Sequence, residues 1–342
     1  MTLRMGSAGT VLLGCALLAT PATAQMSPDM MLQRMDADGD GRISAAEFKG
    51  KRRPFSFFDR DGDGYATREE IEAAMGRGPH AGAAPGRAPE ARIDGQVPIA
   101  RIDEETRCAI SRGRGCDIRL AVARGLFETG LYPRFPEGLS CRGIDERWAI
   151  SYGHKRDREN YHGGIDMPAS FGTPIVAAAA GTVVARFEGA DGYRGREIVI
   201  RHSPEDTGLP LWIYTQYAHF DAMPAVQVGQ RVRMGEPLGP TGNSGISPFS
   251  GRKGKERRPA IHFAAWFSTS QNFAVTDRDV VPADAQWMDP NALYRSLPPF
   301  DSETLKALLS EEKAVPIPVL LEDGTTSPAG TKLIWPYTCS RD

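Results

Sequence analysis

Apolar and polar positions change their spacing along the chain, and the change divides it into segments. From about residue 147 to 293, short runs of β-branched and apolar residues alternate with turns rich in glycine and proline. Short strands separated by frequent turns are typical of a mostly antiparallel β domain. The runs predicted to be strands are 174–178, 182–187, 197–201, 211–217, 226–232 and 260–267.

Helical signals precede this β region. The acidic run Asp103–Glu105 is typical of a first helical turn, where carboxylates face the positive end of the helix dipole. Asp117 is a suitable N-cap for a helix that ends at Gly125. We therefore expect residues 96–146 to form a short helical segment before the β domain.

Two further segments lie outside the β region. Residues 76–95 are rich in glycine, proline and alanine and hold too few large apolar groups to fold, so they predict a linker. After the β domain, residues 294–342 form a C-terminal extension, in which we expect one helix over 302–313 and an irregular tail.

The N-terminus has the features of a secretory signal peptide. Arg4 precedes the short apolar run Val11–Leu18, and Ala22–Ala24 offers small residues for cleavage. We expect residues 1–24 to be removed and the protein to be exported to the periplasm or cell envelope. A spanning helix needs about 20 apolar residues, so a membrane anchor fits the run less well. Lipidation at Cys15 is the other alternative.

Composition narrows the class of protein further. The 342 residues are 25% charged and 41% hydrophobic, with a net charge of -2, which suits one or two globular domains and argues against nucleic acid as a partner. Four cysteines follow the predicted signal peptide, and an even number in an exported protein predicts two disulfides. Of the three possible pairings we favour Cys108–Cys116 with Cys141–Cys339.

Residues 26–75 contain two acidic units with the same spacing. Alternating side-chain oxygens, a central glycine and a final glutamate form the twelve-residue calcium loop of EF-hand proteins. The ligands predicted for the first loop are Asp36, Asp38, Asp40, Arg42 (through its carbonyl), Ser44 and Glu47. Those predicted for the second loop are Asp59, Asp61, Asp63, Tyr65 (through its carbonyl), Thr67 and Glu70.

This resemblance to EF-hand proteins implies two bound Ca²⁺ ions. Only Phe48–Phe58 separates the loops, which is short for two complete helix–loop–helix units, so we expect a shared or truncated helix. Calcium either holds the pair folded or acts as a signal. We favour the structural role because the flexible linker transmits little conformational information.

A second metal site is indicated by two histidines and one aspartate. His162 and Asp166 are four residues apart and face the same side of an extended chain, and His262 lies in a later predicted strand. Two imidazoles and one carboxylate leave a fourth zinc position open, as in catalytic sites. Bound Zn²⁺ lowers the pKa of water to about 7 and polarises carbonyl groups. Taken alone, the spacing also fits a solvated loop histidine.

The residues around this set resemble the lysostaphin/LytM family of zinc endopeptidases. The matching segments are Tyr152-Gly153 with Arg156, His162–Asp166, Gly172–Ile175, Ala179–Val183, Tyr217–His219, Val228–Val232, Gly242–Gly245 and Pro259–Phe263. The resemblance implies a compact antiparallel two-sheet domain over residues 147–293 that cleaves peptide cross-links of bacterial peptidoglycan. It implies His162, Asp166 and His262 as the ligands of one zinc ion and His219 as a catalytic residue. We expect His202 to be structural.

One position departs from the family pattern. The family has a histidine two residues before the last zinc ligand, where this chain has Ala260. A positioned acid or base contributes about 10²–10⁴-fold in rate, so we expect a slow or a nearly inactive enzyme. An insertion at residues 247–258 adjoins this position. Arg258 or Glu256 could replace the histidine, or the insertion is a solvated basic loop.

Three functions are therefore considered. The first is a zinc endopeptidase acting on peptidoglycan stem peptides or cross-links. The second is a non-catalytic protein that binds peptidoglycan or activates a cell-wall hydrolase. In the third, the EF hands dock the protein to a partner.

Overall fold

The computed structural model describes residues 27–39, 41–44, 46–50, 55–59, 65–75, 93–111, 116–144, 154–155, 158–189, 192–246 and 258–342. The chain forms two compact units, residues 1–89 and 90–342, and the boundary falls inside the predicted linker. The predicted signal peptide, the calcium ligands Asp40, Asp61 and Asp63, and residues 247–257 lie outside the described residues.

The smaller unit contains two short strands that form an antiparallel pair. Its described elements are α1 (Pro28–Met35), β1 (Ile43–Ser44), the 3-10 turn η1 (Phe55–Phe57), β2 (Tyr65–Ala66) and α2 (Arg68–Ala74). Ile43 pairs with Ala66 in the antiparallel β1–β2 ladder, which joins the two predicted calcium loops. Of the residues described between the loops, only those of η1 are helical, consistent with the truncated helix that we expected.

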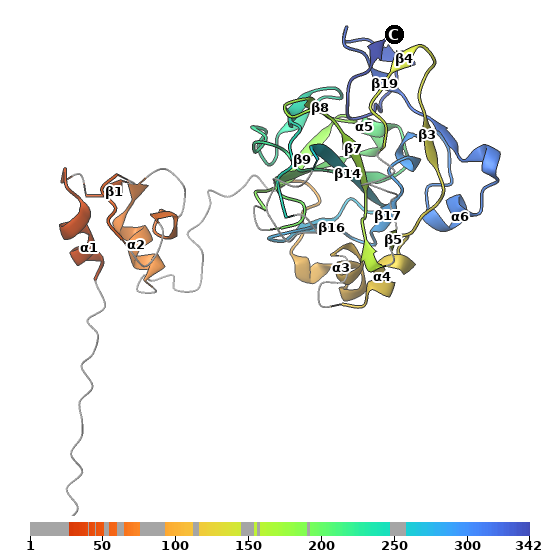
Figure 1. Ribbon diagram of the computed structural model, residues 1–342. Helices are drawn as coiled ribbons and strands as arrows, with labels where there is room; N and C mark the ends of the chain where they lie inside the picture. Colours follow the sequence, from red (N-terminus) through yellow and green to blue (C-terminus); the bar gives the residue numbers. More distant parts are fainter. Residues whose placement is uncertain are drawn as a thin grey trace, which may run out of the picture. The chain divides into compact units, whose positions relative to one another are not determined.

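A seven-stranded antiparallel sheet organises the larger unit (Figure 1). Its strand order is β12-β9-β10-β11-β14-β17, and β7 pairs with the first half of β14. The strands are β7 (Ile165–Pro168), β9 (Gly181–Phe187), β10 (Glu197–His202), β11 (Trp212–Ala218), β12 (Arg231–Val232), β14 (Ala260–Ser268) and β17 (Gln286–Met288). The mostly antiparallel β domain predicted from the sequence is thus confirmed.

Smaller elements surround this sheet. The helices and turns are η2 (Ile99–Arg101), α3 (Glu104–Ile110), α4 (Ile118–Ala123), α5 (Pro204–Thr207), η3 (Ala292–Tyr294), α6 (Ser302–Lys306) and η4 (Ser310–Glu312). The strands form two-stranded pairs: β5 (His154–Lys155) with β6 (Arg158–Tyr161), β8 (Pro174–Val176) with β13 (Pro237–Pro240), β15 (Phe273–Val275) with β16 (Val280–Pro282), β3 (Tyr132–Arg134) with β18 (Ala314–Pro316), β19 (Val319–Leu320) with β20 (Thr326–Ser327), and β4 (Leu139–Ser140) with β21 (Ser340–Arg341).

Each face of the large sheet buries its own apolar cluster, because successive side chains of a strand point to opposite faces. Tyr217 and Phe263 belong to one cluster, whereas Tyr214 and Trp266 belong to the other. The second cluster is covered by residues 93–111, residues 116–126 and the β15–β16 hairpin, which together we call the cap. Trp287 joins the cap to the sheet, since its Nε1 donates a hydrogen bond to the carbonyl of Ala109 at 3.1 Å.

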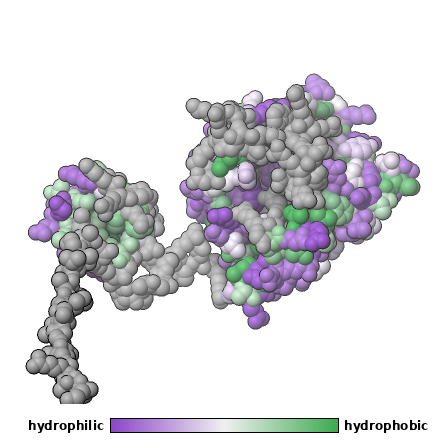
Figure 2. Space-filling view, turned by 60° about the horizontal axis from the view of Figure 1, so that its bottom comes forward, coloured by the Kyte–Doolittle hydropathy of each residue, from purple (hydrophilic) through white to green (hydrophobic). Residues whose placement is uncertain are grey.

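Apolar side chains of the larger unit lie mainly inside. Figure 2 shows a mostly hydrophilic surface with separate hydrophobic patches on the visible face. The large hydrophobic side chains that are at least 42% exposed, among the described residues of both units, are Met30, Tyr132, Phe171, Tyr193, Leu297 and Leu309. None of the described helices combines the length and the apolar character needed to cross a lipid bilayer.

The helical prediction for residues 96–146 is only half right. Asp117 caps α4 as expected, and Gly125 has a φ of +92° just beyond α4. Glu104 and Glu105 lie in the first turn of α3 as expected, whereas Asp103 precedes that turn as its N-cap. Beyond that glycine the chain is extended and supplies β3 and β4. These strands pair with β18 and β21 from the C-terminal residues, a long-range partnership that local spacing does not reveal.

The predicted linker and C-terminal extension also need correction. Residues 93–95 are part of the larger unit, where the N–H of Phe273 donates to the carbonyl of Gly95 at 2.9 Å. The C-terminal residues contribute Trp335 and Tyr337 to the main core, so they are part of one folded unit.

Three predicted elements are longer than those observed, and the first is the strand expected over 174–178, which ends at Val176. The helix expected over 302–313 ends after Lys306, and a separate 3-10 turn follows. The strand expected over 226–232 is reduced to β12, because Gln227–Gln230 form a tight turn in which Gly229 has a φ of +86°.

Two disulfides close the larger unit, in the pairing favoured from the sequence. Cys108 is joined to Cys116 next to α3, and Cys141 is joined to Cys339. The second disulfide spans a sequence separation of 198 residues and fastens the C-terminal tail beside β4.

Candidate metal centre

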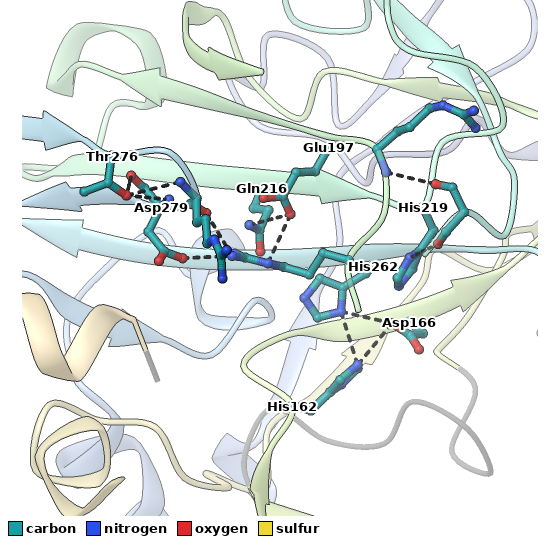
Figure 3. A network of polar contacts seen from close by, with 12 residues as sticks. His162, Asp166, Glu197, Gln216, His219, His262, Thr276 and Asp279 are labelled. Carbon is teal, nitrogen blue, oxygen red and sulfur yellow. Dashed lines mark hydrogen bonds and ion pairs between the residues drawn. The ribbon is translucent and has the colours of Figure 1, made fainter. Parts of the chain in front are cut away.

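The pairing of β7 with β14 brings the predicted zinc ligands together. His262 of β14 lies directly opposite Asp166 of β7 in the antiparallel register. His162 precedes β7 by three residues, and its ring points toward the same place (Figure 3). Residues 100 apart in the sequence therefore meet at one point of the sheet.

Three ligand atoms converge at this point. Nδ1 of His262 lies 3.1 Å from Nε2 of His162 and 3.1 Å from Oδ1 of Asp166. The Nε2 of His162 is 3.2 Å from the same carboxylate oxygen. Zinc bonds to nitrogen and oxygen of about 2.0–2.2 Å place the ligands of one tetrahedral ion roughly 3.3 Å apart. The donor set and its spacing thus fit a single zinc ion.

The surroundings hold these side chains in a buried, polar setting. Asp166 and His262 are 6% and 2% exposed. Burial alone would raise the pKa of the Asp166 carboxyl, but the rings of His162 and His262 outweigh it and hold that pKa well below its usual value. A Cβ at Gly164 would lie 2.7 Å from the His262 ring, so the ring requires glycine there.

His219, the predicted catalytic residue, follows β11 and faces the same centre. Its ring lies 5.9 Å from that of His262. Its Nδ1 is 2.9 Å from the carbonyl of Ser244, which can only accept, so Nδ1 carries the proton. In the neutral ring Nε2 is then the basic nitrogen. The backbone of His219 has a φ of 71°, a conformation that surrounding contacts must hold in a residue other than glycine.

Ala260 stands on the metal-facing side of β14. It lies two residues before His262, so both side chains point to the same face of the sheet. It is 7% exposed and offers only a methyl group. Of the residues suggested as replacements for the missing histidine, Arg258 is exposed and Glu256 lies outside the described residues.

His202 has a structural environment, as expected. It is fully buried, with Nδ1 2.6 Å from the carbonyl of Ala180 and Nε2 2.7 Å from the hydroxyl of Thr215. Burial lowers the pKa of its imidazole to about 4. The ring is therefore neutral in the folded protein at pH 7 and lies outside the metal centre.

Sequence reasoning missed two residues that support His219. Ser244 belongs to the Gly242–Gly245 segment of the family pattern, but the sequence does not show that its carbonyl holds an imidazole. Arg194, whose carbonyl accepts the His219 N–H at 3.1 Å, has no sequence signal. Only the folded chain places both beside His219.

In the smaller unit, part of the first predicted calcium loop is assembled. Oxygens of Asp36, Asp38 and Glu47 lie within 4.8 Å of one another. Asp36 accepts hydrogen bonds from the N–H groups of Gly39 at 2.7 Å and Gly41 at 2.9 Å. Hydrogen bonds, first from Ser44, lower the pKa of Glu47 to about 2, so this ligand is ionised at neutral pH.

Equivalent positions of the two predicted calcium loops make the same contacts. Thr67 donates through its hydroxyl to Oε2 of Glu70 at 2.8 Å, as Ser44 does to Glu47 at 2.7 Å in the first loop. The guanidinium of Arg42 stacks on the ring of Tyr65 at 4.1 Å, so the equivalent positions of the two loops touch. Asp59, the first position of the second loop, is half-buried.

Family models match segments of both units. Residues 160–273 match peptidase family M23, and residues 29–50 and 53–75 each match the EF hand. The M23 match contains His162, Asp166, His219 and His262.

Individual relatives cover only parts of the chain. An uncharacterized metalloprotease of Haemophilus influenzae is 38% identical over 86 residues, which are 25% of this chain and 16% of the relative. The DD-carboxypeptidase/endopeptidase Mpg of Neisseria meningitidis is 28% identical over 164 residues, 47% of this chain and 32% of the relative. The chain thus spans a third or less of the length of these curated relatives.

Solved structures show limited overlap. The catalytic domain of the M23 protein EnpA from Enterococcus faecalis, as an alanine-to-histidine mutant, is 25% identical with a TM-score of 0.27 and covers 40% of this chain and 85% of its own. The catalytic domain of lysostaphin from Staphylococcus simulans is 22% identical with a TM-score of 0.26 and covers 41% of this chain and 80% of its own.

Proposed function

Because the chain carries a peptidase family M23 domain behind two EF hands, we propose that it is an exported zinc metallopeptidase that acts on peptide cross-links of peptidoglycan. The observation that carries this proposal is the convergence of two imidazole nitrogens and one carboxylate oxygen within 3.1–3.2 Å. The remaining steps follow from the residues around that point.

His162, Asp166 and His262 would hold the zinc ion. When bound, zinc supplies a Lewis acid that polarises a peptide carbonyl and lowers the pKa of water to about 7. The two imidazoles must be unprotonated at the nitrogens that face the centre. Asp166 contributes the one negative charge, and its low pKa keeps this charge available across neutral pH.

His219 would accept the proton that the attacking water loses. Because Ser244 holds the Nδ1–H, the Nε2 of His219 is the nitrogen that accepts a proton from the attacking water. The protonated ring can then stabilise negative charge on the carbonyl oxygen or pass the proton to the leaving amine. The fixed backbone of His219 limits the ring to a small set of positions, which favours this role.

Ala260 lowers the turnover that we expect of this site. A methyl group neither moves a proton nor stabilises an oxyanion, so one of the two catalytic groups of the family pattern has no counterpart at this position. We therefore propose turnover about 10²–10⁴-fold below that of a site with both histidines.

The substrate and location rest on the relatives and on the N-terminal sequence. Mpg is named a DD-carboxypeptidase/endopeptidase, which supports peptide bonds of the cell wall as the substrate class. We propose export to the periplasm or cell envelope, supported by the apolar run followed by Ala22–Ala24. Mass spectrometry of the exported protein should find Gln25 as the first residue; an uncleaved N-terminus contradicts the signal peptide.

The same position supports a second candidate function. Without the histidine at Ala260, the domain would bind peptidoglycan, or activate a cell-wall hydrolase, and perform no cleavage. The complete ligand set argues against this alternative, because a binder has no chemical need for three converging zinc ligands. Zinc content measured at neutral pH distinguishes the two: about one zinc per chain favours the enzyme, and a metal-free protein favours the binder.

A digest of purified cell wall provides the direct test. We expect slow release of new muropeptides by the zinc-loaded protein, loss of release in Asp166→Ala, and an increase of about 10²–10⁴-fold in Ala260→His. Asp277→Ala, whose carboxylate is 83% exposed, is the matched control and should behave as the wild type.

Each outcome of the digest has a meaning. No products from the wild type, beside an active M23 enzyme in the same digest, contradicts the peptidase proposal. Products that appear only with Ala260→His favour the binder, with the metal site retained. Products that persist in Asp166→Ala show that the cleavage does not use this centre.

A further inference from the structure

A buried charged cluster lies beside the metal centre, and the catalytic proposal does not use it. The guanidinium of Arg194, with only 16% of the side chain exposed, contacts Oε2 of Glu197 at 3.2 Å and Oδ1 of Asp279 at 2.8 Å. It also donates to the carbonyl of Arg278 at 3.0 Å. Glu197 in turn accepts from Nε2 of Gln216 at 3.0 Å (Figure 3).

This cluster connects different parts of the fold. Glu197 begins β10, Gln216 belongs to β11, and Asp279 lies in the turn of the β15–β16 hairpin. Burial disfavours the charge of Arg194, but Glu197 and Asp279 outweigh it and raise its pKa, so the guanidinium stays charged. Arg194 is therefore anchored on two sides, once to the sheet and once to the cap.

The main chain of the same turn holds His219. The carbonyl of Arg194 accepts the His219 N–H at 3.1 Å. Two residues later, the N–H of Arg196 donates to the hydroxyl of Ser244 at 3.0 Å, and the carbonyl of Ser244 is 2.9 Å from Nδ1 of His219. Both the backbone and the ring of His219 are thus held by residues 194–196 and Ser244.

Close packing makes these two contacts depend on each other. A Cβ at Gly195 would lie 2.3 Å from the carbonyl carbon of Ser244, so the two segments touch through their backbones. A shift of residues 194–196 must therefore also shift Ser244. His219 depends on such support because its φ of 71° is unfavourable for a residue with a side chain.

We propose that Arg194 is a positioning residue for His219: its ion pairs with Glu197 and Asp279 fix the turn whose carbonyl, together with Ser244, sets the backbone and the ring orientation of His219. The proposal deepens the proposed function, because the role of His219 as proton acceptor depends on that function. It also links the cap to the position of His219 through one residue, because Asp279 belongs to the cap.

The test is Arg194→Gln in the full-length, zinc-loaded protein, with Arg231→Gln as the matched control. Arg231 also pairs with a carboxylate, Asp206, at 2.6 Å, but on the edge strand β12. The first measurement is the NMR spectrum of ¹⁵N-labelled imidazoles, which reports which ring nitrogen carries the proton. We expect the His219 signals of Arg194→Gln to shift toward a mixture of tautomers, while those of His202 stay unchanged.

The second measurement is activity in a double-mutant cycle. We expect Arg194→Gln to lower kcat about ten- to hundred-fold in the wild type and to cause no further loss in His219→Ala. Arg231→Gln should leave kcat unchanged, and the zinc content should stay the same in all variants.

The outcomes separate this inference from the proposed function. Unchanged His219 signals in folded Arg194→Gln, equal changes at His202, or an equal loss of kcat in His219→Ala would overturn the positioning role. If the wild type has no activity, the peptidase proposal fails while the NMR result still decides the role of Arg194. If Arg194→Gln does not fold, Asp279→Asn takes its place: shifted His219 signals support the inference and unchanged signals overturn it.

Discussion

Two buried histidines, His202 in β10 and His219 directly after β11, differ in how their ring nitrogens are held. The ring of His219 has one nitrogen held by a carbonyl and faces the metal centre with the other. Both nitrogens of His202 are engaged, one by the carbonyl of Ala180 and the other by the hydroxyl of Thr215. In the first arrangement Nε2 of His219 is left to face the candidate metal centre. In the second arrangement both ring nitrogens of His202 are used to hold the ring in the core.

The low pKa of His202 makes stability depend on pH. The pKa of this imidazole is about 4 in the folded protein against 6.5 for a solvated histidine, so between these two pH values the unfolded chain binds a proton that the folded chain does not. Stability is therefore complete above about pH 6.5 and falls as the pH drops toward 4. The expected loss is about 3 kcal/mol.

Urea unfolding of the larger unit at pH 7.5 and pH 4.5 measures this loss. A variant that cannot be protonated, His202→Gln, should be less stable than the wild type at pH 7.5 and should lose less stability on acidification. An equal pH dependence in both proteins would assign the loss to other groups.

In the segment that we call the cap, each of the helices α3 and α4 begins directly after an aspartate N-cap residue. Asp103 accepts the N–H of Thr106 at 2.8 Å, and Asp117 accepts the N–H of Arg119 at 2.9 Å. Such bonds satisfy donors that the first turn of a helix leaves open. Tertiary packing then decides where each element ends, as in α6, which stops after Lys306 although apolar residues continue.

Removal of the N-cap side chain of α3 should destabilise this helix, which covers the second core cluster. We expect Asp103→Ala to lower the free energy of unfolding of the larger unit by about 1 kcal/mol, because one N–H of the first turn loses its acceptor. Glu104→Ala, next to it and exposed, is the matched control and should change stability by less than about 0.5 kcal/mol. Equal effects of the two substitutions would show that Asp103 acts by charge alone.

In the molecule as a whole, covalent links and long-range strand pairs close the larger unit. The C-terminal residues return to pair with β3 and β4, and they place Trp335 in the core, where its Nε1 donates to the carbonyl of Arg142 at 2.7 Å. Cys141–Cys339 fastens the same contact covalently. The segment that looked like an extension is therefore needed to complete the core.

The two disulfides should differ in their effect on stability. In the chain-entropy description, a link across 198 residues stabilises by about 5 kcal/mol and one across 8 residues by about 2.5 kcal/mol. We expect the pair of substitutions Cys141→Ser and Cys339→Ser to lower the unfolding midpoint more than Cys108→Ser with Cys116→Ser. Thermal unfolding of both double variants measures the difference, and the opposite order would contradict this account.

Local chemistry in the sequence was enough to predict much of this protein. Strand spacing, helix caps and the two twelve-residue acidic units depend on neighbouring residues, so their positions could be read directly. The sequence also named His162, Asp166 and His262 as candidate zinc ligands, mainly through the resemblance of the segments around them to a known family, and zinc binding by these residues stays a prediction.

What only the folded structure decided depends on contacts between distant residues. The register of β7 against β14 sets the ligand distances, and the C-terminal strands complete the core although nothing near them predicts their partners. Arg194 and Ser244 contact His219 through their main-chain carbonyls. Every residue has such a carbonyl, so the residue types at these positions could not predict the contacts. The sequence thus specified the chemical groups of the centre, and tertiary packing specified their geometry.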